Sequence, residues 1–182
     1  GLNNEKRTVL VVGGSLGALT INESISANLD YFAGNDIQLI WQTGKWFYEK
    51  AKTRVKEVDS PLIKVYEFIY DMDLAYALAD VIISRAGAIA VSELCIVGKP
   101  CILIPSPNVA EDHQTKNANA LVLKNAALMV KDVEAKEQLI PLVDGLMKDE
   151  RLRNKLSSGL RSMGIRDADK RIVEEVEKLV RK

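Results

Sequence analysis

The stretch from Thr8 to Ala18, TVLVVGGSLGA, places a short apolar run directly before a glycine-rich turn. Its first five residues are mostly β-branched, which is typical of a strand buried on both faces of a sheet. We expect a helix to follow at about Ala18 to Leu29, with the N–H groups of the turn near its positive end. The stretch therefore predicts a strand, turn and helix unit of an α/β domain.

The same alternation of strand and helix continues along the chain. The further strands that we expect are 37–41, 63–68, 81–84, 101–104 and 127–130, and the helices that we expect between them are 45–55, 71–79, 87–97 and 113–124. From residue 136 the pattern is helical, with breaks near 148–149 and from Gly159 to Arg166, and an amphipathic final helix from Ala168 to Val180. The fold class that we predict is α/β, a Rossmann-like doubly wound parallel sheet of about six strands with helices on both faces.

Length and composition favour one globular domain over the whole of residues 1–182, because 182 residues with 47% hydrophobic content suffice for a single core. Lys and Arg together number 25, as do Asp and Glu, so no excess charge attracts nucleic acid and we expect no nucleic-acid partner. No window approaches the length of an apolar membrane helix, and the first residues lack a signal peptide, which favours a cytoplasmic chain. Residues 1–7 we interpret as a linker or tag remnant, since Gly1 stands where a native chain would begin with Met.

The two cysteines, Cys95 and Cys101, fall on a predicted helix and on the strand that follows it. Their spacing matches neither a zinc site nor a disulfide framework. We therefore expect two buried thiols, no metal ligand and no cofactor.

The turn Gly13-Gly14-Ser15-Leu16-Gly17 lets backbone N–H groups approach a phosphate, with the Ser15 hydroxyl free to donate. Three other interpretations have to be weighed. The glycines can serve a tight turn alone. The pattern GxSxG also fits a hydrolase with Ser15 as nucleophile and His113 as base, but only about a dozen residues precede it, which disfavours this interpretation. A dinucleotide site is disfavoured because Gln42 stands where an acidic residue is expected.

Two further groups of polar residues follow later strands. In the segment from Ser84 to Glu93, the small Gly87 and Ala88 let a ligand approach a helix start, and the Glu93 carboxylate can accept hydrogen bonds from two vicinal hydroxyls, as a ribose presents. A solvated helix residue is the alternative for Glu93. After the fifth strand, His113 stands beside Gln114, whose amide can donate to and accept from sugar hydroxyls. A lone histidine is more often a structural donor than a catalyst.

Five motifs in this order resemble the carboxy-terminal half of the GT-B transferases of glycosyltransferase family 28. The motifs are GGSxGAxxxN from Gly13 to Asn22, FIxDM from Phe68 to Met72, SRAGAxxxSE from Ser84 to Glu93, GxPxxxxPxP from Gly98 to Pro107, and HQxxNA from His113 to Ala118. Each motif is modest by itself, whereas the ordered set is highly specific. The resemblance covers about Thr8 to Lys124, and Leu16 departs from the glutamine common in that turn.

The resemblance implies that the chain is the donor-binding half of a bacterial enzyme that transfers N-acetylglucosamine from UDP-N-acetylglucosamine to lipid I, making lipid II for peptidoglycan. It implies that the Ile69 backbone recognises uracil, that Glu93 holds the ribose, and that Gln114 reads the sugar hydroxyls. It also implies that Gly13, Gly14 and Ser15 lie at the diphosphate of the donor. The start of a helix, at Arg85, Gly87, Ala88 and Ile89, is implied to contact the donor as well, and His113 and Asn117 are implied to support the contact that Gln114 makes.

The same resemblance implies a further, amino-terminal half that carries the acceptor site and the catalytic base. We therefore expect no catalytic residue and no metal in these 182 residues. The whole enzyme is expected to be peripheral on the cytoplasmic face of the bacterial inner membrane, which it contacts mainly through that other half. Another GT-B transferase of UDP-sugars and a non-catalytic nucleotide-binding domain are the alternatives.

Overall fold

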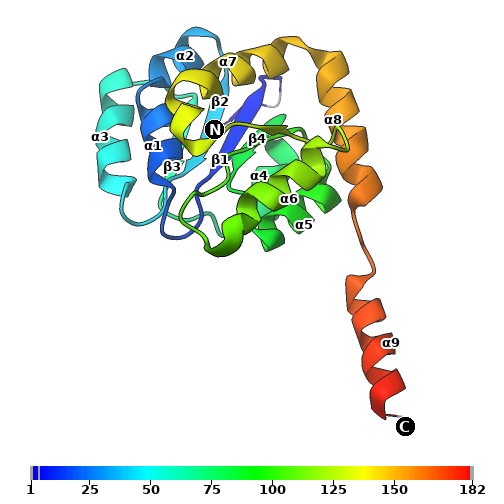
Figure 1. Ribbon diagram of the computed structural model, residues 1–182. Coiled ribbons are helices and arrows are strands. Elements are labelled where there is room, and N and C mark those ends of the chain that lie inside the picture. The colour runs from blue at the N-terminus through cyan, green and yellow to red at the C-terminus, as the bar shows by residue number, and fades with distance from the viewer. Residues whose placement is uncertain (1, 4, 181–182) are drawn as a thin grey trace.

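The computed structural model describes residues 2–3 and 5–180, and its centre is a parallel sheet of six strands (Figure 1). Gly1, which the sequence analysis took as part of a remnant, lies outside the described residues. The strands are β1 (Thr8–Val12), β2 (Gln38–Gln42), β3 (Ile63–Tyr66), β4 (Val81–Ser84), β5 (Cys101–Leu103) and β6 (Leu128–Met129). Their order across the sheet is β3-β2-β1-β4-β5-β6, which confirms the predicted doubly wound α/β fold.

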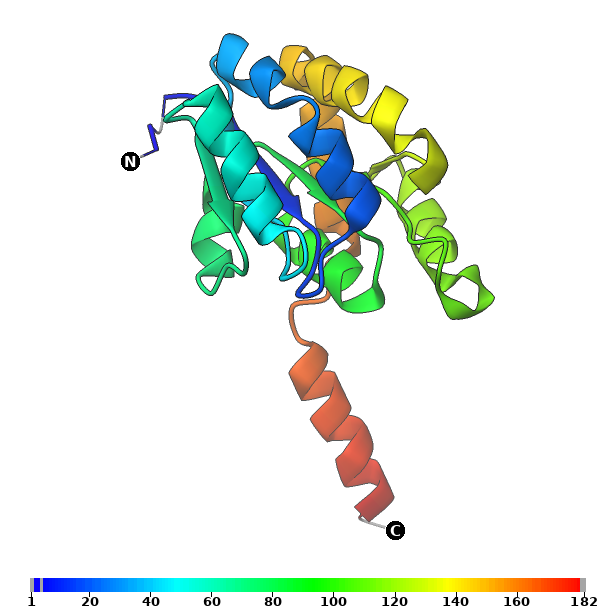
Figure 2. The same cartoon turned by 90° about the vertical axis from the view of Figure 1, so that its left-hand side faces the viewer.

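Helices cover both faces of this sheet. They are α1 (Leu19–Ser26), α2 (Leu29–Gly34), α3 (Tyr48–Val58), α4 (Met72–Leu78), α5 (Ala88–Val97), α6 (His113–Val122), α7 (Ala135–Lys148) and α8 (Glu150–Met163). A last helix, α9 (Ala168–Val180), follows them in the chain. Short 3-10 turns, Ala110–Asp112 and Asp132–Glu134, precede α6 and α7. Figure 2, turned by 90°, shows the helices in layers on either side of the strands.

Successive strand residues are buried in two different clusters, because side chains alternate between the faces of a sheet. Val9 and Val11 of β1 lie in a cluster with residues of α1, α2, α3 and α7, whereas Leu10 lies in a second cluster with residues of α4, α5 and α6. Helix α8 contributes to both clusters, through Leu156 and Leu160. The two-sided burial explains why the strands read as continuous apolar runs.

Several helix boundaries differ from the prediction, among them those of α3, which begins and ends three residues later than expected. The helix expected over 18–29 is interrupted near Ala27, and a separate helix, α2, follows it. The break expected from Gly159 to Arg166 is present but begins later, because α8 continues to Met163 and α9 begins at Ala168. A Cβ at Gly159 would lie 2.7 Å from the Asn125 carbonyl oxygen, so this glycine permits close packing of the helix rather than ending it.

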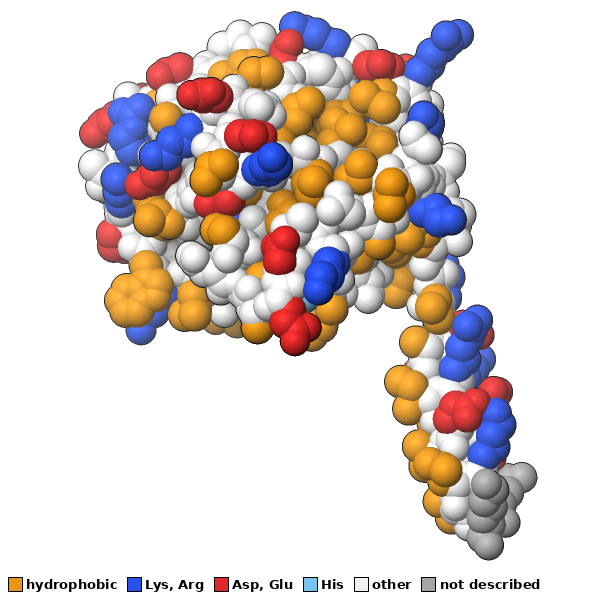
Figure 3. Space-filling view, viewed as in Figure 1, with side chains coloured by type: hydrophobic (Ala, Val, Ile, Leu, Met, Phe, Trp, Pro, Cys, Tyr) orange, Lys and Arg blue, Asp and Glu red, His pale blue; other side chains and the backbone are white. Residues whose placement is uncertain are grey.

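Helix α9 extends away from the rest of the domain (Figures 1 and 2), and none of its residues is buried. Its apolar side chains gather along one side, as Figure 3 shows. They are Ile172, Val173, Val176, Leu179 and Val180, which are 53% to 78% exposed. An amphipathic helix with such a stripe normally packs against another surface. No described helix is long and apolar enough to cross a membrane.

Both cysteines are buried and carry free thiols, as predicted. Cys101 on β5 is fully buried, and burial raises the pKa of its thiol to about 12. Because the thiolate is the reactive form, we expect neither Cys95 nor Cys101 to react with iodoacetamide in the native protein at pH 8. Mass spectrometry should detect two modified cysteines after denaturation in guanidinium. Rapid native labelling of Cys101 would contradict this packing.

Candidate functional site

The loops that follow the six strands all open at the carboxyl edge of the sheet. Because β1 lies between β2 and β4, the direction of chain progression across the sheet reverses there. Ligands of doubly wound folds bind at such a switch point. The loops from Gly13 to Ala18 and from Arg85 to Gly87 flank this point, so the first and second groups of predicted site residues are brought together.

The glycine-rich turn after β1 is packed tightly against the segment that follows β2. Gly17 and Gly44 both have positive φ angles, +90° and +72°. A Cβ at Gly44 would lie 2.1 Å from the backbone nitrogen of Gly17, so only glycine fits there. The Lys45 N–H also donates to the Ser15 carbonyl oxygen at 3.1 Å. The turn is therefore held in one conformation by backbone contacts.

A buried asparagine on α1 reinforces that contact. Asn22 Nδ2 donates to the Thr43 carbonyl oxygen at 2.8 Å, and Asn22 Oδ1 accepts from the Trp41 indole N–H at 3.0 Å. Both ends of the amide are thus used, as a buried polar group requires. The sequence motif contained Asn22, but its role is evident only from this geometry.

The starts of α1 and α5 can receive an anion. Neither helix has an acidic residue in its first turn, and neither has a side-chain hydrogen bond at its N-cap, Ala18 and Gly87 respectively. Helices α3 and α4 also follow strands and carry Glu49 and Asp73 in their first turns. Because the first N–H groups of a helix are unsatisfied and lie at its positive end, α1 and α5 favour a bound phosphate.

Glu93 lies on α5 and is exposed, which leaves its carboxylate accessible to a ligand. The Tyr76 hydroxyl, on α4, donates to Glu93 Oε2 at 3.2 Å. Burial raises the pKa of Tyr76, and the neighbouring Glu93 charge raises it further. Both residues line a largely apolar pocket of about 500 Å³ between α4 and α5, beside Met72 and Ile96. Sequence analysis did not identify Tyr76.

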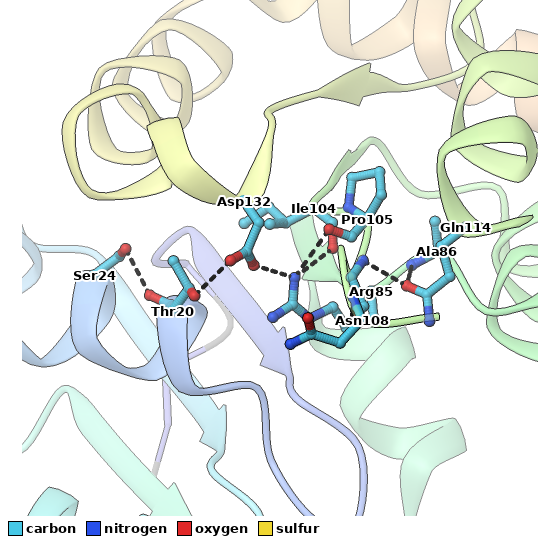
Figure 4. Close-up of polar contacts among 10 residues, drawn as sticks. Thr20, Ser24, Arg85, Ala86, Ile104, Pro105, Asn108, Gln114 and Asp132 are labelled. Carbon is cyan, nitrogen blue, oxygen red and sulfur yellow. Dashed lines mark hydrogen bonds and ion pairs between the residues drawn. The ribbon is translucent and has the colours of Figure 1, made fainter. Parts of the chain in front are cut away.

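The amide of Gln114 joins two loops, as Figure 4 illustrates for one of its contacts. Gln114 Oε1 accepts from the backbone N–H groups of Ala86, at 3.2 Å, and Ser106, at 2.9 Å. Asn117 Nδ2 donates to the Ala86 carbonyl oxygen at 3.0 Å. The acceptor end of Gln114 is therefore occupied within the protein, and only its amide nitrogen remains for a ligand.

His113 begins α6, and its Nδ1 lies 2.8 Å from the Ala110 carbonyl oxygen. This contact fits a supporting role for the imidazole. The structure brings His113 and Gln114 to the same side of the sheet edge as the Arg85–Gly87 loop, which Gln114 contacts. Ile89 is 78% exposed in the first turn of α5.

Arg85 lies in a network of its own at the switch point (Figure 4). Its guanidinium forms an ion pair with Asp132 and also donates to the carbonyl oxygens of Ile104, at 3.0 Å, and Pro105, at 3.2 Å. Asp132 Oδ2 in turn accepts from the Thr20 hydroxyl at 2.7 Å. Arg85 thus joins the loops after β4, β5 and β6 to α1. Asp132, 47 residues away, carried no signal in the sequence.

The loop after β3 contains Ile69, which is buried. Its backbone N–H donates to the side-chain oxygen of Gln42, Oε1, at 2.9 Å. Phe68 and Tyr70 flank it, with ring centroids 5.1 Å apart in an edge-to-face arrangement. The predicted base-recognition residue is therefore at the sheet edge, with one of its two backbone groups already bonded.

Among residues 2–3 and 5–180, no group of three or more His, Cys, Asp or Glu side chains is arranged to hold a metal ion. The groups that remain available to an anion at this edge are the backbone N–H donors at the starts of α1 and α5. This arrangement suits an anionic ligand that is bound through hydrogen bonds.

Comparison with known proteins gives a consistent result. A model of the glycosyltransferase family 28 C-terminal domain matches residues 8–172. The enzymes named UDP-N-acetylglucosamine--N-acetylmuramyl-(pentapeptide) pyrophosphoryl-undecaprenol N-acetylglucosamine transferase from Parabacteroides distasonis and Cytophaga hutchinsonii are 49% and 53% identical, over 100% and 99% of this chain. The chain covers 50% and 48% of those two proteins, so it spans about half the length of the curated relatives that it matches.

Among solved structures, a crystal structure of MurG from Acinetobacter baumannii superimposes with a TM-score of 0.83 and 29% sequence identity. The match covers 95% of this chain and 50% of that one. The similarity therefore extends over nearly the whole domain described above.

Proposed function

The chain belongs to the family of glycosyltransferase family 28 C-terminal domains, and on that basis we propose that it is the UDP-N-acetylglucosamine-binding half of an N-acetylglucosaminyltransferase. The whole enzyme transfers the sugar to lipid I and produces lipid II. The observation that carries the proposal is the pair of open helix starts, α1 and α5, on either side of the switch point. A nucleoside diphosphate sugar presents its diphosphate to such a pair.

Each part of the donor has a complementary group at this edge. The Ser15 hydroxyl and the N–H groups around Gly13 and Gly14 bind the diphosphate. The exposed Glu93 carboxylate accepts hydrogen bonds from the two ribose hydroxyls, and the backbone of Ile69 binds uracil. The amide nitrogen of Gln114, whose oxygen is already bonded to Ala86 and Ser106, donates to a hydroxyl of the sugar.

The reaction that we propose is an inverting transfer. The 4-hydroxyl oxygen of the acceptor sugar bonds to the anomeric carbon of the donor, while the bond from that carbon to the UDP oxygen breaks. UDP leaves with the bonding electron pair, and the N–H groups at the starts of α1 and α5 stabilise its added charge. We assign the group that takes the hydroxyl proton to the amino-terminal half of the enzyme.

The partner that we propose for this chain is that amino-terminal half, which carries the lipid I site and most of the membrane contact. The exposed apolar side of α9 supports this assignment, because none of its side chains is buried against the described part of the domain. Burial of the stripe against a second domain would remove five large apolar side chains from water.

Glu93→Gln tests the ribose contact without changing the size of the side chain. A carboxylate is a stronger acceptor than an amide, and hydrogen bonds to charged groups contribute about 1.5–3 kcal/mol. We therefore expect calorimetry to give roughly a tenfold or larger loss of UDP affinity. The wild-type preference for UDP over 2′-deoxy-UDP should shrink in parallel.

Glu57→Gln is the matched control, because Glu57 is an exposed carboxylate on α3 whose ion-pair partner among the described residues is Arg54. Its UDP affinity should equal that of the wild type. If Glu93→Gln binds UDP as tightly as the wild type does, the ribose assignment is refuted.

A further inference from the structure

Gln42 ends β2 at the carboxyl edge of the sheet and is only 2% exposed. Its side chain lies on the face of the sheet that packs against α4 and α5, because Ile40, two residues earlier, belongs to that cluster. The buried hydrogen bond that Gln42 Oε1 accepts from the Ile69 N–H is 2.9 Å long. In the sequence, Gln42 occupies the position at which dinucleotide-binding sites have an acidic residue.

The backbone after Gln42 already holds the beginning of the β3 loop. The Thr43 N–H donates to the Tyr66 carbonyl oxygen at 2.9 Å, and the Gly44 N–H donates to the Glu67 carbonyl oxygen at 3.1 Å. Ile69 lies beyond the last of these backbone bonds. The Ile69 side chain is packed in the cluster with Ile40 and Ala75, and the Gln42 side chain bonds its backbone N–H.

This bond determines what Ile69 can offer to a ligand. Its N–H is occupied, whereas its carbonyl oxygen accepts no hydrogen bond from any described residue. A carbonyl oxygen requires a donor on the ligand. Uracil carries a donor at N3, whereas cytosine carries an acceptor at the same position, so a fixed carbonyl at this point distinguishes the two bases.

We propose that Gln42 is a positioning residue for base selection, which holds the Ile69 loop so that its free carbonyl oxygen favours uracil over cytosine. The inference rests on the proposed function, because it takes Ile69 to lie against the base of the donor. It adds to that function a residue on another strand and a physical origin for the choice of base. Gln42 acts through Ile69 and touches no reacting atom.

The test compares UDP with CDP as ligands of the whole chain, by calorimetry. Gln42→Met keeps a similar side-chain length but removes the acceptor, so the preference for UDP over CDP should fall by about tenfold, the equivalent of one hydrogen bond. Gln42→Glu retains an acceptor for the Ile69 N–H and should keep most of the preference. A purely structural role would weaken both ligands equally and leave their ratio unchanged.

Gln38→Met is the matched control. Gln38 begins the same strand and is equally buried, and its amide bonds to the Thr8 hydroxyl and the Asn3 carbonyl at the opposite edge of the sheet. This variant should keep the wild-type ratio of UDP to CDP affinity. A wild-type ratio in folded Gln42→Met would overturn the proposal. Wild-type protein that shows no preference for UDP would instead overturn the proposed function.

Hydrogen exchange provides a second measurement that does not depend on any variant. The Ile69 amide should be protected from exchange in the ligand-free protein, because it is buried and bonded to Gln42. Exchange of Ile69 at the rate of an unstructured peptide would show that the bond does not persist in solution, and would overturn the proposal even if Gln42→Met failed to fold.

Discussion

Gly44→Ala is expected to lower the free energy of unfolding by about 3–5 kcal/mol and to abolish measurable binding of the donor. The added Cβ would lie 2.1 Å from the Gly17 nitrogen and 2.4 Å from its Cα, and these backbone atoms cannot move aside as a flexible side chain would. The positive φ of +72° adds strain for any residue with a Cβ. Urea denaturation followed by circular dichroism measures the change.

Substitutions at two other glycines distinguish the cost of the steric overlap from the cost of the backbone strain. Gly14 has a φ of +80° but no atom within 4 Å of an added Cβ, so Gly14→Ala should cost only about 1–2 kcal/mol. Gly145 lies inside α7 with the same free space, and Gly145→Ala should stabilise the protein by about 0.5–1 kcal/mol. If Gly44→Ala were no more destabilising than Gly14→Ala, the packing of the two turns would be wrong.

Asp132→Ala should destabilise the chain by about 2–3 kcal/mol, because it leaves the Arg85 guanidinium without its carboxylate and the Thr20 hydroxyl without its acceptor. The two side chains of the ion pair are only 19% and 13% exposed, so water compensates the loss poorly. The Arg85 loop leads directly into α5, and UDP affinity should fall as well. Denaturation and calorimetry on the same preparation measure both effects.

The exposed ion pair between Glu175 and Lys178 on α9 supplies the control. Glu175→Ala should change the free energy of unfolding by less than about 1 kcal/mol and leave UDP binding intact. Equal effects of Asp132→Ala and Glu175→Ala would contradict a central role for the Arg85 network.

The fold could be predicted from the sequence because its strands are buried on both faces and bounded by glycine-rich turns. The ends of helices were harder to predict than the strands where a glycine is required for close packing. Glycine often ends a helix, yet Gly159 lies inside α8. It is accommodated there because the Asn125 backbone approaches the helix so closely that a Cβ would not fit. This contact joins two segments that are distant in the sequence, so local sequence patterns do not predict it.

The candidate site was predictable only where motifs placed small or polar residues directly after strands. Ser15, Glu93 and Gln114 became candidates because their motifs follow strands. Hydrogen-bond and ion-pair partners from distant segments could not be predicted in this way, since the Tyr76 hydroxyl reaches Glu93 from another helix and Asp132 reaches Arg85 from another loop. Their hydrogen bonds arise from the tertiary fold rather than from local spacing.

Direct titration of this chain with UDP-N-acetylglucosamine, UDP, ADP and NAD tests the central claim, that the sheet edge binds a uridine diphosphate sugar. We expect calorimetry to give one site per chain that binds UDP-N-acetylglucosamine and UDP more tightly than ADP or NAD. Tighter binding of NAD or ADP, or no binding of either uridine ligand by the folded chain, would contradict the account.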